Sequence, residues 1–104
     1  MTVYAVNIPK GVDISPALQF GEIKHINVRY VYGDEIENQR LPKEVEERMR
    51  IAAENFNPDR DYLLIAGDHL QLLAFVAFLV RENDELIRVL RWDKKAEGYL
   101  QVLI

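Results

Sequence analysis

The chain has 104 residues, of which 49% are apolar and 29% charged, and its formal net charge is −4. That size and composition predict a single globular domain with one hydrophobic core. The sequence contains no cysteine, which excludes disulfide frameworks, thiolate metal sites and cysteine nucleophiles. The acidic balance argues against non-specific binding to nucleic acids or to anionic membranes, because both need a basic protein surface.

The chain also has no sequence signal for a membrane. Its N-terminal segment, MTVYAVNIPKG, lacks the basic start and the apolar run of a secretory signal peptide. From Leu70 to Val80 only Gln71 is polar, but this run is too short for a spanning helix, which needs about 20 residues. We therefore expect a cytoplasmic protein without membrane contact.

Two strands are predicted in the N-terminal part of the chain. Val3–Ile8 is rich in β-branched and aromatic residues and stops at a Pro-Lys-Gly turn. A connection with a short helical turn near residues 16–20 follows. Ile23–Tyr32 alternates between apolar and polar side chains, which predicts a second strand with one buried face. The polar segment 34–40 predicts a loop.

An amphipathic helix is predicted to begin at Leu41-Pro42, with Pro42 in the first helical position. It ends before Pro58, because proline cannot continue a helix. Charged residues occupy much of its remaining surface, as on a solvated face. Four apolar residues, spaced by four, three and four positions, form the stripe that should face the core: Val45, Met49, Ala52 and Phe56.

The stretch YLLIAGDH predicts the centre of the fold. Tyr62–Ala66 is apolar without alternation, which is typical of a central strand buried on both faces. Gly67 supplies a turn. Asp68 can then cap a helix, and Gln71 three residues later completes a D-x-x-Q pattern like a capping box.

The helix that follows, from Leu70 to Val80, is apolar nearly all round. Such a helix is buried on more than one side. Either the sheet and the other helix cover it, or part of it is a subunit interface. We expect a homodimer that uses this apolar area.

Two further strands, Leu86–Trp92 and Tyr99–Ile104, are joined by a turn at residues 93–98. The order of elements is therefore β-β-α-β-α-β-β. Strands separated by helices favour parallel pairing through right-handed crossovers, and the last two strands can form an antiparallel hairpin. The predicted fold is a single small α/β domain with a mixed sheet, residues 62–66 as its central strand, and helices on one or both faces.

A strand, a glycine and a helix N-terminus meet at Gly67-Asp68-His69, which is where α/β folds place phosphates and other anions. Trp92-Asp93 would end a neighbouring parallel strand at the same sheet edge, so both motifs could line one cleft for a small molecule or nucleotide. The pattern is neither a P-loop nor G-x-G-x-x-G, and Asp68 puts negative charge where a phosphate would sit. The alternative is that glycine and aspartate serve backbone geometry and capping alone.

Basic residues gather on the C-terminal hairpin near Trp92 and Tyr99, an arrangement that could bind single-stranded nucleic acid by stacking and phosphate contact. Acidic residues flank the same segment and offset much of the field, so we do not expect nucleic-acid binding. No ligand motif predicts a metal ion or a cofactor, and nothing selects a catalytic residue. The basic residues are Arg88, Arg91, Lys94 and Lys95.

Several of these pieces occur together as D-Y-L-L, two residues, G-D, an apolar helix and then R-V-x-x-L-x-W-D. Here they are residues 61–64, Gly67-Asp68 and residues 88–93, followed by Tyr99. This arrangement is similar to the C-terminal half of a family of small proteins from tailed bacteriophages, and ISPA and FGEI in the N-terminal part resemble the same family. That family usually has proline where this chain has His69, which favours the capping role of Asp68. The resemblance implies a phage origin and the host cytoplasm, and it brings no activity.

Three functional hypotheses follow. The favoured one is a non-enzymatic phage accessory protein that binds a host or phage protein. The second is a small-molecule or nucleotide-binding protein, or an enzyme, that uses the junction at Gly67–His69. The third is binding of single-stranded nucleic acid by the C-terminal hairpin.

Overall fold

The chain forms one mixed sheet with helices between its strands. A computed structural model describes residues 1–9, 11–26 and 41–104. Across these residues five strands are ordered β2-β1-β3-β4-β5. The strands are β1 (Thr2–Ala5), β2 (Glu22–His25), β3 (Tyr62–Leu64), β4 (Arg88–Asp93) and β5 (Gly98–Leu103), and the helices are η1 (Ser15–Phe20), α1 (Lys43–Asn55) and α2 (His69–Glu82).

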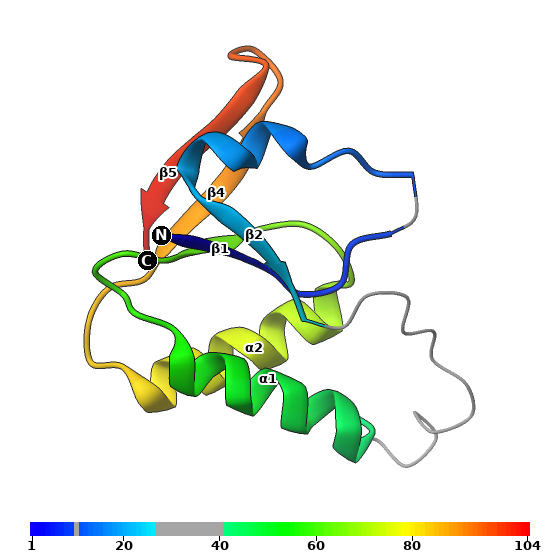
Figure 1. Ribbon diagram of the computed structural model, residues 1–104, viewed down its shortest axis with the longest axis vertical. Helices are drawn as coiled ribbons and strands as arrows, with labels where there is room; N and C mark the ends of the chain where they lie inside the picture. Colours follow the sequence, from blue (N-terminus) through cyan, green and yellow to red (C-terminus); the bar gives the residue numbers. More distant parts are fainter. Residues whose placement is uncertain (10, 27–40) are drawn as a thin grey trace.

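The strand directions follow from the connections. β1 pairs in parallel with β2 on one side and with β3 on the other, and β3 pairs in parallel with β4. β5 returns antiparallel to β4 as a hairpin (Figure 1). The α/β fold predicted from the sequence is therefore confirmed, with its mixed sheet, its central strand and its C-terminal hairpin. The helical turn expected near residues 16–20 is the 3₁₀ helix η1.

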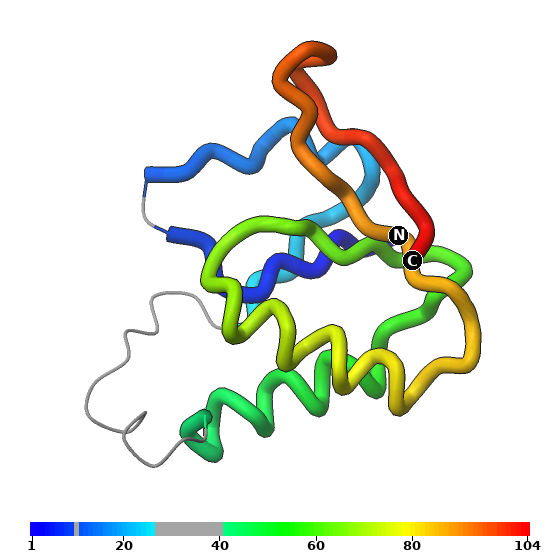
Figure 2. The backbone as a smooth tube through the Cα atoms, turned by 180° about the vertical axis from the view of Figure 1, so that it is seen from behind, coloured from blue at the N-terminus to red at the C-terminus, as the bar shows by residue number. Residues whose placement is uncertain are grey.

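The two α-helices lie side by side on one face of the sheet, and η1 lies on the other (Figure 1). Seen from behind, the same two layers flank the strands, and the β4–β5 hairpin projects beyond them (Figure 2). A hydrophobic cluster lies on each face of the sheet, and alternate residues of a strand contribute to one cluster or the other. Tyr4 and Leu63 pack with the helices, whereas Val3 and Leu64 pack on the η1 side.

The apolar stripe predicted for the first helix is buried in the structure. Val45, Met49, Ala52 and Phe56 are all buried on the sheet side of α1. The ring of Phe56 lies 5.3 Å from the ring of Tyr4 on β1. Burying such aromatic and aliphatic side chains stabilises the fold by roughly 1.5–3 kcal/mol each. No helix among the described residues is long and apolar enough to cross a membrane.

Some boundaries differ from the sequence prediction. β1 and β3 stop at Ala5 and Leu64, because beyond them the chain leaves regular pairing for a single parallel bridge between Asn7 and Gly67. Pro42 caps α1 from outside instead of occupying its first helical position, because its ψ of 144° is extended. The predicted strand residues 27–32 and the predicted loop 34–40 lie outside the described residues.

Asp61, immediately before β3, joins the start of β1 to the segment between α1 and β3. This carboxylate is 6% exposed. It accepts hydrogen bonds from the backbone N–H of Thr2 at 3.1 Å and of Asn57 at 2.8 Å. A buried carboxylate is tolerated only when such donors surround it. It therefore fixes the start of β1 and the α1–β3 connection against each other.

Candidate functional site

The junction between β3 and α2 is built around a close approach of two backbones. Gly67 has φ +95° and forms a parallel bridge with Asn7. A Cβ at position 67 would lie 1.9 Å from the carbonyl oxygen of Asn7. The next residue, Asp68, donates its backbone N–H to that same carbonyl at 3.2 Å. Gly67 is thus required by the backbone geometry of the junction itself.

Asp68 caps α2, as the sequence predicted. Its side chain accepts the backbone N–H of Gln71 at 3.0 Å. The reciprocal half of a capping box is absent, because the Gln71 side chain faces the sheet and makes no hydrogen bond to a described residue. His69 is exposed at the first position of the helix.

The cap gives a modest and specific prediction. Asp68→Ala should lower the free energy of unfolding by about 1 kcal/mol, because it removes an acceptor from the first turn of α2. Asp68→Asn keeps an acceptor and should recover most of that loss, whereas His69→Ala should change stability by less than about 0.5 kcal/mol. Chemical denaturation monitored by circular dichroism measures all three. A larger effect of His69→Ala than of Asp68→Ala would contradict this assignment.

Trp92 and Asp93 have local partners of their own. The Trp92 ring meets the Tyr99 ring edge-on, with centroids 5.2 Å apart. The Asp93 carboxylate accepts the backbone N–H of Ala96 at 3.2 Å in the hairpin turn. The junction at Gly67 is bridged to Asn7, two residues after the end of β1. Trp92 lies two positions beyond Leu90, whose carbonyl accepts the backbone N–H of Ile65.

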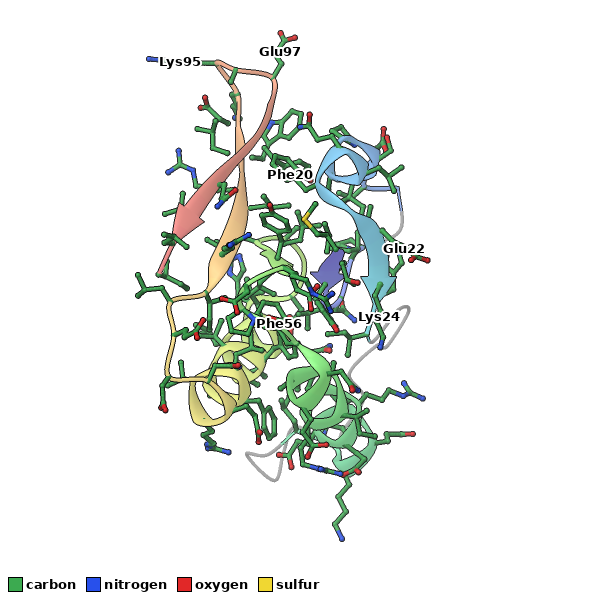
Figure 3. All side chains as sticks on the ribbon, turned by 60° about the vertical axis from the view of Figure 1, so that its left-hand side comes forward. Phe20, Glu22, Lys24, Phe56, Lys95 and Glu97 are labelled. Carbon is green, nitrogen blue, oxygen red and sulfur yellow. The ribbon has the colours of Figure 1, made fainter. Side chains whose placement is uncertain are left out.

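The four basic residues of the hairpin do not share one face. Arg88 lies over the ring of Tyr62, with its guanidinium carbon 5.9 Å from the centroid. Arg91 is three positions further along β4, so it projects from the opposite face of the strand. Lys95 extends from the hairpin tip, where Glu97 points in another direction (Figure 3). Burial and the charge of Asp13 raise the pKa of Tyr99 at the same end.

In the described part of the chain, no group of three or more His, Asp or Glu side chains is placed to hold a metal ion.

A buried amide is the feature that sequence reasoning missed. Gln71 is fully buried between α2 and the sheet, and among the described residues neither its Oε1 nor its Nε2 atom has a hydrogen-bond partner. It occupies the core-facing row of α2 together with Phe75 and Leu79. The spacing of these residues, at positions 71, 75 and 79, was the available signal, because it places glutamine on the apolar face.

Replacing this amide should stabilise the protein. An unsatisfied buried polar group costs about 1–3 kcal/mol, so Gln71→Leu should raise the free energy of unfolding by an amount in that range. The exposed Gln19 of η1 offers a matched control, and Gln19→Leu should change stability by less than about 0.5 kcal/mol. Differential scanning calorimetry measures both. A lower melting temperature for Gln71→Leu would show that the amide has a partner in solution.

The outer face of α2 is an exposed apolar surface on the helical layer. Four residues at spacings of three, four and three positions turn away from the sheet. Leu73 is 68% exposed and Val80 is 62% exposed. The predicted all-round apolar character is thus divided, with one face in the core and the other in contact with solvent. We call this surface the α2 outer face, and it consists of Leu70, Leu73, Ala77 and Val80.

Two hollows adjoin the α2 outer face along the boundary with α1. One, of about 450 Å³, is lined by Phe78 and by charged residues of the first half of α1. The other, of about 300 Å³, is lined by Ala74, Ala77 and Phe78 of α2, with Leu41 and Glu46 opposite. The small side chains of Ala74 and Ala77 open this space, and Phe78 and Glu46 line both hollows. Together they form a shallow groove between the two helices.

The fold and surface define a small mixed-sheet α/β protein whose exposed helix face is apolar. A family model described as phage Pam3 gp32-like protein matches residues 1–104. The chain therefore belongs to this phage protein family, which confirms the phage family expected from the resemblance. Neither the curated proteins nor the solved structures contain a match.

Proposed function

We propose that this chain is a non-enzymatic phage accessory protein that binds a host or phage protein in the host cytoplasm through the α2 outer face. The observation that supports this most strongly is the exposure of Leu73 and Val80 on a helix whose opposite side is fully buried. Apolar residues that cluster on one exposed face are characteristic of protein-interaction sites.

The shape of the surface favours an amphipathic helix as the partner element. The spacing of the α2 outer face is that of one helical stripe, which an incoming helix can contact with residues at i, i+3, i+4 and i+7. Phe78 lines the groove beside it, and Ala77 belongs both to the groove and to the α2 outer face. A third helix laid along this boundary would cover both the stripe and the groove.

One of the charged residues that line the groove is paired within its own helix. Arg50 on α1 is paired with both Glu47 and Glu54. These pairs are exposed and contribute little to stability, but they leave the guanidinium engaged within its own helix. A partner would gain affinity from burying the leucine and valine side chains of the α2 outer face.

The non-enzymatic part of the proposal rests on how the junction residues are used. Gly67 accommodates the Asn7 backbone, Asp68 caps α2 and Asp93 closes the hairpin turn. Each of these residues has a structural role that accounts for its type.

A comparative pull-down from lysate of phage-infected host cells tests the proposal. The tagged chain is compared with Leu73→Glu/Val80→Glu and with Leu18→Glu, a control on η1 whose parent residue is 57% exposed. We expect one protein to be retained by the parent chain and by the control but lost at least tenfold from the double variant. Identical recovery by all three, or recovery of no protein, would overturn the proposal. Circular dichroism must show that all three chains are folded.

A further inference from the structure

The two edges of the sheet differ in how they are protected. β2 forms one edge and has the sequence EIKH, in which Glu22 and Lys24 project along the outside of the molecule (Figure 3). β5 forms the other edge, and from Gly98 to Ile104 it has neither a charged residue nor a proline. Proteins normally place charges, especially lysine, or proline on a free edge to prevent pairing with another strand. β5 has none of these protections.

The hydrogen bonds of the hairpin identify which backbone groups of β5 point away from β4. Ile87 and Ile104 exchange both backbone bonds at 2.9 Å, so they form a hydrogen-bonded pair. Such pairs alternate along an antiparallel ladder, and therefore Leu100 and Val102 also direct their N–H and C=O groups toward β4. Tyr99, Gln101 and Leu103 direct theirs outward. The outward groups have the spacing that a further antiparallel strand requires.

The side chains of β5 are complementary to themselves. Leu100 is 45% exposed and Val102 is 43% exposed, on the same face of the strand. If two copies of β5 paired about a twofold axis at Gln101, Leu100 of each copy would lie opposite Val102 of the other. On the second face, Tyr99 would lie opposite Leu103. Apolar side chains would meet throughout, apart from the two Gln101 amides, which can bond to each other.

We propose that the chain forms a homodimer in which β5 pairs antiparallel with β5 of a second copy, with the twofold axis at Gln101. The two five-stranded sheets then become one continuous sheet. An uncharged, self-complementary edge fits a second copy better than a charged partner, since no like charges face each other across the axis. The α2 outer face stays open in this dimer, so the assembly is independent of the binding function proposed above and differs from a dimer formed through that helix.

Charges introduced at the axis test both the interface and its register. Sedimentation velocity should give twice the chain mass of 12.1 kDa for the parent protein. Gln101→Lys and Gln101→Glu each place two like charges face to face, so each variant alone should be monomeric, with at least a tenfold weaker dimer. An equal mixture of the two should dimerise again, because lysine then faces glutamate. Leu73→Lys, on the α2 outer face, should remain dimeric.

Chemical cross-linking provides a second measurement that does not depend on charge. The chain has no cysteine, so Gln101→Cys introduces a single thiol. A short bismaleimide should convert this variant largely to a covalent dimer, while Leu18→Cys on η1 should stay monomeric. A monomeric parent protein, a dimer that persists in Gln101→Lys, or no recovery in the lysine–glutamate mixture would each overturn the proposal.

Discussion

Gly67→Ala should lower the free energy of unfolding by roughly 3 kcal/mol or more, because two penalties coincide at this position. The residue has φ +95°, which is costly for any residue with a Cβ. The added methyl group would also lie 1.9 Å from the Asn7 carbonyl oxygen, and a backbone atom cannot move aside as a flexible side chain does. In a domain of this length, the melting temperature should fall by more than about 10 °C.

Gly11→Ala is the matched control for this substitution. Gly11 has a similar φ of +90°, but a Cβ there would meet nothing within 4 Å. Gly11→Ala should therefore lower the free energy of unfolding only by the conformational penalty, about 1–2 kcal/mol. Thermal denaturation of both variants separates the steric contribution from the conformational one. Equal losses for the two variants would mean that the approach of Asn7 to Gly67 does not constrain the native state.

The sequence could predict the sheet because its strands are locally distinct. Tyr62–Ala66 has no charged or amide side chain, and such a run in a small domain is typical of a strand at the centre of a sheet, where both faces are covered. The order of strands and helices then restricted the parallel pairings, since crossovers join strands that run in the same direction. The capping role of Asp68 was predictable for the same reason, because a cap depends on residues within one turn.

Features that depend on the packing of distant segments could not be read in this way. The bridge between Asn7 and Gly67 joins residues far apart in the sequence, and it accounts for both early strand ends. It also holds the junction to the segment that follows β1. The sequence predicted the Gln71 amide as half of a capping box, whereas the structure buries it. The pattern D-x-x-Q does not reveal which face of the helix is turned toward the core.

The sequence of α2 also could not show which of its faces packs in the core. An all-round apolar pattern indicates more than one contact surface, but it does not separate the face that stabilises the fold from the face that remains open. In the structure these faces are Phe75 and Leu79 on one side and Leu73 and Val80 on the other. Mutation of neighbouring residues on the two faces distinguishes their roles.

Phe75→Ala should lower the free energy of unfolding by about 3–5 kcal/mol, the range found when a fully buried aromatic side chain is truncated to alanine. Phe75 has no exposed surface, and its ring centroid lies 6.2 Å from that of Tyr4 on β1. The substitution would leave a cavity between α2 and the sheet. Unfolding in urea, followed by circular dichroism, measures the loss as a shift of the midpoint at an unchanged slope.

Leu73→Ala, two residues earlier in the same helix, should change the stability of the chain by less than about 0.5 kcal/mol, because Leu73 is 68% exposed. Helix propensity does not account for such a difference, since alanine replaces a large apolar residue in both variants. The contrast therefore isolates tertiary burial from local structure. Comparable losses would mean that the α2 outer face is covered in the native protein, whereas the expected difference leaves Leu73 free to contribute to binding without contributing to folding.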